Sequence, residues 1–229
     1  MKTMTVCAVL VAAAGLAGAD MYNDATGEIF DTGFAHLDIA SVTLTNDADF
    51  LYISVQTTGD LDNPNWGKYA IGINNGKDAS DAGNGWGRNI DWNGQTITHW
   101  SATWADDGGT GAGGEVYNFD GGWNLLGATY NGDSNISGDD SQHAAGVQSW
   151  AISLATLNLV VGDTFTFDII TTGGGNDPGV DHLSRADQAT PFWDTTSVAG
   201  DFLSYTVVPA PGAAALLGMG GLLATRRRR

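Results

Sequence analysis

The strongest constraint on the fold is a repeated alternation of apolar and polar residues in short runs. Leu51, Ile53 and Val55 alternate with more polar neighbours. Successive side chains of a strand point to opposite faces, so a period of two predicts a half-buried β-strand. A similar run, His36 to Asn46, precedes it, and the short Asp47-Ala48-Asp49 segment between them predicts a hairpin.

Comparable runs recur along the chain and predict about ten strands in all. The further candidates are Tyr69–Ile73, Trp100–Trp104, Trp150–Ile152, Phe165–Ile169 and Phe202–Val207, with weaker ones at Arg88–Trp92, Val116–Phe119 and Trp123–Tyr130. Only Ser153–Leu159 has a helical pattern. We therefore expect an all-β fold, an antiparallel two-sheet β-sandwich of the jelly-roll kind. Gly-rich loops are expected at 74–87, 106–114, 131–146 and 173–189, and no repeat or linker divides residues 20–207, which predicts one domain.

The charge is segregated along the chain. The formal net charge is −17, from 9 Lys+Arg and 26 Asp+Glu. Five of the basic residues are Lys2 and Arg226 to Arg229, so residues 20–211 hold four basic residues against all 26 acids, or −22. Such a body repels a phosphate backbone, which argues against nucleic-acid binding. The acids are almost all Asp, which favours loops over helices.

The N-terminus has the pattern of a secretory signal peptide, residues 1–19. Lys2 precedes an apolar run from Val6, and Ala17-Gly18-Ala19 provides small residues at a cleavage site before Asp20. The alternative is a buried first helix. Cys7, the single cysteine, lies inside this run, so the cleaved protein would contain neither disulfides nor thiols.

The C-terminus, residues 208–229, combines a proline motif, an apolar helix and a basic end. Val208-Pro209-Ala210-Pro211 precedes the apolar run Gly212–Thr225, and Arg226, Arg227, Arg228 and Arg229 follow. As a helix this run reaches about 21 Å, short of the ~30 Å hydrocarbon core, so it is a marginal span. The arginines would stay on the cytoplasmic side while the body lies outside. A plain tail anchor is the alternative to a sorting signal that a membrane protease cuts.

These C-terminal residues closely resemble the PEP-CTERM signal of bacterial exosortase substrates. The resemblance lies in Val208, Pro209, Pro211, the glycine- and leucine-containing run after them and the arginine cluster, with Ala210 where the family motif has Glu. It implies export, transient inner-membrane insertion, cleavage by an exosortase-type protease after signal peptidase has acted, and a final place at the cell surface or in extracellular polymer.

A second resemblance concerns the body. Its segments are Leu37–Ile39, Thr45–Asp47, Asn65–Tyr69, Gly85–Arg88, Thr171–Gly175 and Asp181–Ser184. Together they are similar to the β-sandwich domains related to DOMON and to family-nine carbohydrate-binding modules. This implies a sugar- or cofactor-binding ancestor. A haem held by Met and His is excluded, because no Met lies between residues 22 and 207.

The residues predicted to bind polysaccharide are Trp66, Trp86, Arg88 and Asn84. Sugars are bound by aromatic faces together with amide, carboxylate and guanidinium groups, and these residues lie in Gly/Asn-rich loops. The alternative is that both tryptophans cover the ends of the core. Trp100 and Trp104 share one face of a strand and could form a flat platform, although core packing is the more ordinary role.

Calcium is the cofactor that the abundant Asp residues suggest, since it takes six to eight oxygen ligands. Asp133, Asn135 and Asp139 have part of the spacing of a calcium loop, but Ile136 and Gln142 stand where Gly and an acid are required. Asp20 and Asp24, with Asn23 and Glu28, are a second possibility. Solvated acidic loops are the alternative for both. Zinc is disfavoured, because the four His are scattered and no Cys remains.

The sequence contains no Gly-x-Ser-x-Gly motif and no Ser, His and Asp set that indicates catalysis. We therefore expect an exported, surface-sorted, non-catalytic protein of the extracellular polymer, with polysaccharide as its ligand. The alternatives are a structural or adhesive protein stabilised by calcium and, third, a polysaccharide-active enzyme.

Overall fold

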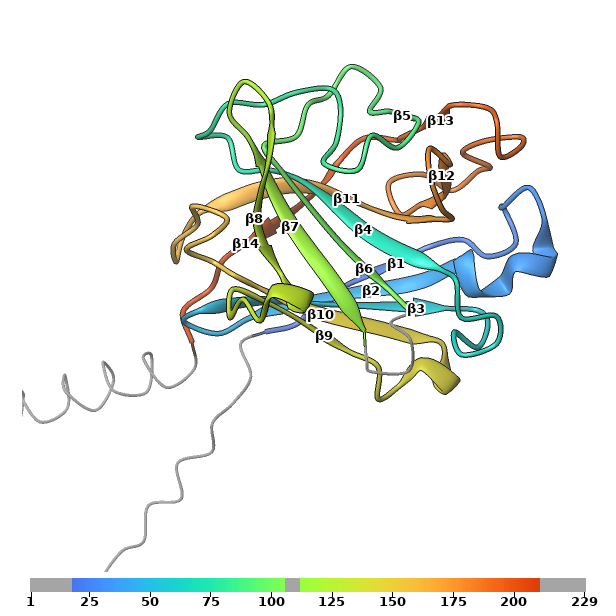
Figure 1. The fold of residues 1–229 in the computed structure, drawn as a ribbon, viewed down its shortest axis with the longest axis horizontal. Helices are drawn as coiled ribbons and strands as arrows, with labels where there is room; N and C mark the ends of the chain where they lie inside the picture. The colour runs from blue at the N-terminus through green and yellow to red at the C-terminus, as the bar shows by residue number, and fades with distance from the viewer. Residues whose placement is uncertain (1–17, 106–111, 211–229) are drawn as a thin grey trace, which may run out of the picture.

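The computed structural model describes residues 18–105 and 112–210, and within them the chain is all-β with antiparallel sheets, as predicted (Figure 1). Residues 1–17 of the predicted signal peptide (residues 1–19), expected as a signal helix, and the predicted C-terminal apolar helix lie outside these residues. None of the helices in the described ranges is long and apolar enough to cross a membrane.

The smaller sheet has five strands in the order β1-β2-β3-β10-β9, all antiparallel to their neighbours. The strands are β1 (Asp20–Asn23), β2 (Ile39–Asn46), β3 (Phe50–Thr57), β9 (Ile136–Asp139) and β10 (Val147–Ser153). The predicted hairpin is confirmed as β2–β3, with Val42 opposite Val55. Its turn is closed by Asp47, whose Oδ1 accepts the N–H groups of Asp49 and Phe50 at 2.8 and 2.7 Å.

The larger sheet has seven strands, ordered β12-β11-β4-β6-β7-β8, with β14 also paired to β11. They are β4 (Lys68–Asn74), β6 (His99–Trp104), β7 (Gly113–Phe119), β8 (Trp123–Ala128), β11 (Thr164–Thr172), β12 (Gly179–His182) and β14 (Leu203–Thr206). All neighbours are antiparallel. The strands β1 and β12 lie far apart in the sequence. Each of them is an edge strand of its sheet.

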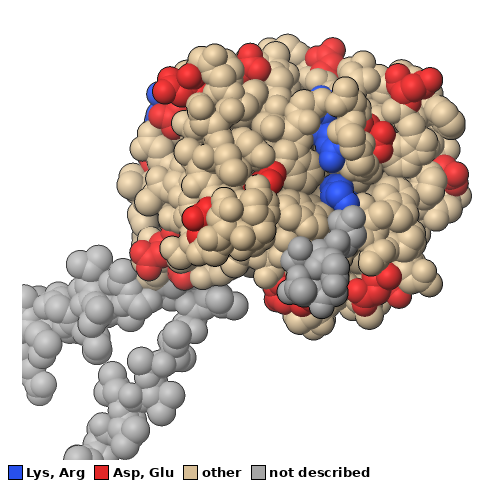
Figure 2. Space-filling view, in the orientation of Figure 1, with Lys and Arg blue, Asp and Glu red and all other residues tan. Residues whose placement is uncertain are grey.

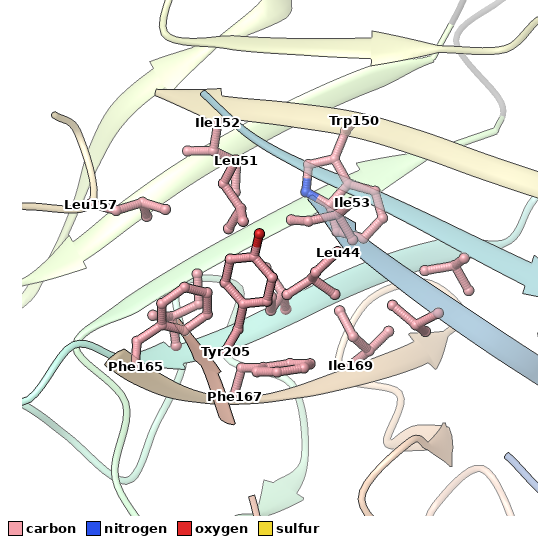
Figure 3. Packing of buried hydrophobic residues seen from close by; sticks show 14 of the residues in the cluster. Leu44, Leu51, Ile53, Trp150, Ile152, Leu157, Phe165, Phe167, Ile169 and Tyr205 are labelled. Atoms are coloured by element: carbon pink, nitrogen blue, oxygen red, sulfur yellow. The ribbon is translucent and has the colours of Figure 1, made fainter. Parts of the chain in front are cut away.

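One hydrophobic core takes side chains from both sheets (Figure 3). The smaller sheet contributes Leu44, Leu51, Ile53, Trp150 and Ile152, and the larger sheet contributes Ile71, Ile73, Phe165, Phe167 and Ile169. These are the apolar members of the alternating runs, and they are nearly fully buried. The assignment of Trp150 and Phe167 to the core is confirmed.

The larger sheet is also covered on its other face. Trp100, Ala102 and Ile170 from the sheet pack against Trp92 and Ile97 from the long loops. Figure 1 shows the loops between β4 and β6 on the side of the larger sheet away from β3 and β10. This second layer explains why residues 69–73 of β4 are buried without interruption, whereas β3 alternates.

The remaining elements are short. They are the 3₁₀ helices η1 (Thr32–Leu37), η2 (Thr129–Asn131) and η3 (His143–Ala145), and the parallel two-residue strands β5 (Ile90–Asp91) and β13 (Ser197–Val198). The helical interpretation of Ser153–Leu159 is wrong. Ser153 ends β10 and turns follow it: the N–H of Leu157 donates to the carbonyl of Ser153 at 3.2 Å, which closes one turn, and Asn158, at a positive φ of 53°, prevents this turn from continuing as a helix.

Candidate functional site

Three carboxylates from distant parts of the chain meet at the edges of the two sheets. They are Asp24, Glu28 and Asp181, and one ligand oxygen of each lies within 4.8 Å of the others. Asp24 directly follows β1, Glu28 lies in the loop after it, and Asp181 belongs to β12. We call these three residues the carboxylate cluster.

The backbone holds the first two carboxylates in place. The N–H of Asp24 donates to the carbonyl of Ala40 at 3.1 Å, which extends the β1–β2 pairing by one residue. The N–H of Gly27, at a φ of 83°, donates to both carboxylate oxygens of Asp38 at 3.0 and 3.1 Å. Asp38 thereby anchors the loop that positions Glu28.

Asp181 joins the two sheets. Its Oδ2 accepts the N–H of Ile39 in β2 at 2.7 Å, and its Oδ1 accepts the N–H of His182 at 2.8 Å. The residue is only 2% exposed. A buried carboxylate with two backbone donors is well oriented, and its remaining lone pairs are available to a cation.

The electrostatics of the cluster is unfavourable when all three carboxylates are ionised. Burial and the nearby Glu28 raise the pKa of Asp24 to about 7, and burial raises the pKa of Glu28. The pKa of Asp181 is raised well above its ordinary value, again by burial and by Asp24. Every charged neighbour contributing to these shifts is another carboxylate.

Three oxygens of the cluster are buried without a hydrogen-bond partner: Oδ2 of Asp24 and both Oε1 and Oε2 of Glu28. Buried polar atoms are nearly always paired, so an unpaired group of this kind requires an explanation. Hard oxygen ligands at close spacing are what Ca²⁺ binds. The donor set therefore fits a calcium ion, with further ligands from backbone or water.

The other residues predicted to bind calcium are placed differently. Asp20 is exposed on β1. In the described residues, Asp20, Asp133 and Asp139 belong to no group of three His, Cys or acidic side chains with ligand atoms this close. Asp133 accepts the N–H of Ala128 at 3.0 Å, and the amide of Asn135 donates to the carbonyl of Leu126 at 3.2 Å.

Sequence reasoning reached Asp24 and Glu28 but missed Asp181. Asp181 lies in a strand of four residues within a segment whose Gly and Asp content predicts a loop. Its contact with Ile39 spans 142 residues, and no local pattern signals such a pairing.

Three of the residues predicted to bind carbohydrate come together. The Oδ1 of Asn84 accepts the N–H groups of Trp86 and Arg88 at 3.2 and 2.9 Å, and its Nδ2 donates to the Arg88 carbonyl at 3.0 Å. Asn84 thus fixes the turn. The guanidinium carbon of Arg88 lies 5.0 Å from the centroid of the Trp86 ring, and the indole N–H of Trp86 donates to Glu115 at 2.6 Å.

Trp66 lies in a different aromatic cluster. Its ring centroid is 5.6 Å from that of Phe34, 4.5 Å from that of His36 and 5.9 Å from that of Trp193. Trp100 is fully buried, whereas Trp104 is half-buried with its ring 5.9 Å from that of Trp86. The two therefore do not form an open platform.

Figure 2 shows how charge is distributed on one face of the body. Acidic side chains are spread over that face, whereas the basic side chains near its centre lie in a hollow. The acids are therefore available to cations over a wide area, and the carboxylate cluster differs from them by its burial.

A Ser, His and Asp set also exists, in the interior. The Nδ1 of His182 lies 2.7 Å from Oδ2 of Asp168, and its Nε2 lies 3.0 Å from Oγ of Ser197. All three residues are fully buried, and the Ser197 oxygen also accepts the N–H of Gly179 at 2.9 Å. The sequence of contacts, from Asp to His to Ser, resembles a hydrolase triad. Because the Ser197 hydroxyl is buried, a substrate could not reach it, and the contacts instead connect β12 to β13.

Comparison of the chain with protein-family models gives no match, and no curated protein matches it either. The two family resemblances therefore stay predictions, and the site is interpreted from its own geometry.

Proposed function

We propose that the chain is an exported, non-catalytic β-sandwich protein of the cell surface whose two sheets are fastened together by calcium. The single observation that supports this is the carboxylate cluster, with three buried oxygens that have no hydrogen-bond partner. The cluster links the edge strand β1 to the edge strand β12. Calcium bound there would replace repulsion between the sheets by attraction.

Export and calcium binding are consistent with each other. Calcium sites of extracellular modules bind with dissociation constants of about 10⁻⁴–10⁻³ M, which suits a calcium-rich exterior. The cluster also begins four residues after the predicted cleavage site, at Asp24. A cation at this position would therefore anchor the new N-terminus of the cleaved protein.

Surface sorting is supported by where the folded body ends. The side chain of Asn46 accepts the N–H of Val208 at 3.0 Å and donates to its carbonyl at 2.9 Å. Pro209, next along the chain, is exposed. The first residue of the predicted sorting motif is thus held by the body and the exposed Pro209 follows it, which is compatible with access by a membrane protease.

Deleting residues 209–229 is expected to leave the body folded but to abolish surface delivery and release it into the periplasm. Cell fractionation followed by immunoblotting measures this, with the full-length chain as the control. Normal surface delivery of the truncated chain would contradict the sorting proposal.

The calcium proposal is tested by thermal unfolding of the purified protein with chelator, with excess calcium and with excess magnesium. Calcium at about 100 times its dissociation constant stabilises by about 2.7 kcal/mol, which for a chain of this size raises the melting temperature by roughly 5–10 °C. Magnesium should raise the melting temperature by less than calcium does, because Mg²⁺ requires a smaller site of nearly ideal octahedral geometry. Equal melting temperatures in chelator and calcium would contradict the proposal.

Polysaccharide binding is a second candidate function, favoured by the stacked pair of Trp86 and Arg88 beside the larger sheet. A guanidinium held over an indole ring is positioned to donate to sugar oxygens. Affinity electrophoresis through gels containing polysaccharide measures it directly, and unretarded migration in every gel would remove this candidate.

A further inference from the structure

A polar pocket next to the stacked pair brings together three segments that are far apart in the sequence. Its lining residues are Gly87, Arg88 and Asn89, then Asn176 and Asp177, and finally Trp193 and Asp194. Its volume is about 460 Å³, within the range of small-molecule sites. We call these seven residues the Arg88 pocket.

Arg88 is the buried charge of this pocket. The residue is 8% exposed, its Nη1 donates to the carbonyl of Gly175, and its Nε is buried without a hydrogen-bond partner. Trp86 supports the guanidinium from one side, and Asn84 fixes the turn. A guanidinium has five N–H donors in a rigid fork, so this one has donors to spare.

Trp193 is the aromatic wall, and other rings hold it in position. Its centroid lies 5.0 Å from that of Phe30 and 5.4 Å from that of Phe34, both edge-to-face, and Trp66 packs against it as well. Gly173 allows the close approach, since a Cβ there would meet the Trp193 ring at 3.1 Å and Oδ2 of Asp177 at 2.3 Å. The indole is therefore fixed before any ligand arrives.

The remaining polar lining groups are carboxylates, which accept hydrogen bonds, and side-chain amides, which both donate and accept. Asn176 and Asp177 add an amide and a carboxylate to the pocket lining, and the charge of Asp177 acts on the Arg88 guanidinium. Asp194 adds a second, exposed carboxylate. One guanidinium against two carboxylates gives the pocket a formal charge of −1, within a body of −22.

We propose that the Arg88 pocket binds one neutral hexose residue of a polysaccharide. A hexose offers hydroxyls that donate to carboxylates and accept from Arg and Asn, and an apolar ring face that packs on an indole. Anionic sugars and phosphates are disfavoured by Asp177, Asp194 and the acidic body. This inference rests on the second candidate function and names its ligand class and its site.

The test uses the exported protein with methyl glucoside, methyl galactoside and methyl mannoside, followed by calorimetry, with glucuronate as the anionic comparison. At least one neutral glycoside should bind, and Trp193→Ala and Asp177→Asn should each weaken binding at least tenfold. Phe192→Ala is the matched control, because Phe192 is an exposed neighbouring aromatic that does not line the pocket, and it should leave binding unchanged.

The outcomes separate the pocket from the broader function. If Trp193→Ala fails to fold, Asp177→Asn, which is isosteric and lies at the pocket surface, decides the matter. Unchanged glycoside binding or polysaccharide retention in the folded variants overturns the pocket but leaves polysaccharide binding intact. No binding of any glycoside or polysaccharide overturns both, and tighter binding of glucuronate overturns the neutral ligand class.

Discussion

Two acidic regions of this protein contain similar side chains in opposite circumstances. In the loop and strand after β8, the carboxylates of Asp133 and Asp139 accept hydrogen bonds from backbone N–H groups at 3.0 and 2.9 Å. In the carboxylate cluster, Asp24 and Glu28 direct buried oxygens at other carboxylates. The first region stabilises its own turns, whereas the second has buried carboxylate oxygens without a hydrogen-bond partner.

The pKa values express the same contrast. Hydrogen bonds from Ser141 lower the pKa of Asp139, while burial and Glu28 raise that of Asp24 to about 7. Local hydrogen bonds therefore account for the carboxylates at calcium-loop spacing, whereas three buried oxygens of the carboxylate cluster have no such partner.

The largest expected effect comes from Asp181. Asp181→Ala removes the acceptors of the buried N–H groups of Ile39 and His182, and each unsatisfied donor costs about 1–3 kcal/mol. In calcium buffer we expect the free energy of unfolding to fall by about 3 kcal/mol, measured by urea denaturation. The control, Asp139→Ala at the exposed end of β9, should change the free energy of unfolding by about 0.5 kcal/mol at most. Equal losses in the two variants would break the comparison.

Glu28→Gln should abolish the calcium dependence of the melting temperature. The amide keeps the shape of the side chain but removes the charge that calcium needs, and it also removes repulsion on Asp24. In chelator the variant should therefore melt at or above the wild-type temperature, whereas in calcium it should melt below it. Thermal unfolding in both buffers measures this, and a variant that still gains several degrees from calcium would contradict the assignment.

The effect of pH on stability should have opposite signs in the two regions, because the pKa of Asp24 is raised and that of Asp139 is lowered. Because the folded-state pKa values of Asp24, Glu28 and Asp181 are raised, the native state holds protons that the unfolded state has released. Without calcium, this contribution to stability is present at about pH 4 and is lost as the pH rises through about 7. Melting temperatures at pH 5 and pH 8 in chelator should show the loss, and calcium should reduce it. A flat profile in chelator would contradict the raised values.

The smallest expected effect is in the other acidic region. Asp133→Asn and Asp139→Asn should leave the rise in melting temperature caused by calcium unchanged, since neither residue joins the carboxylate cluster. The same thermal scan serves as the measurement. A reduced response in either variant would place the cation in the loop that the sequence spacing favoured.

The sequence predicts those parts of the structure that local patterns specify. The β2–β3 hairpin and the core faces around Ile53 and Phe167 follow from alternation and a short turn. The four-residue strands β1 and β12 do not, because each is short and rich in Asp, Asn or Gly, so no apolar–polar alternation marks it.

The candidate sites divide in the same way. Asp24 and Arg88 could be singled out because chemically suitable residues lie beside them in the sequence. Asp181 and Trp193 could not, since each reaches its site only through the folded chain, by contacts with Ile39 and with Phe30. Asn84, predicted as a ligand-binding residue, has its amide bonded to the backbone of Arg88, so in the structure it holds the turn.

The central claim is that calcium binds between Asp24, Glu28 and Asp181. Isothermal titration of the chelator-stripped protein with calcium tests it most directly. We predict one dominant site per chain, absent from Glu28→Gln and retained with unchanged affinity in Asp133→Asn. No saturable binding by the wild-type protein, or binding that survives Glu28→Gln and disappears in Asp133→Asn, would contradict the claim.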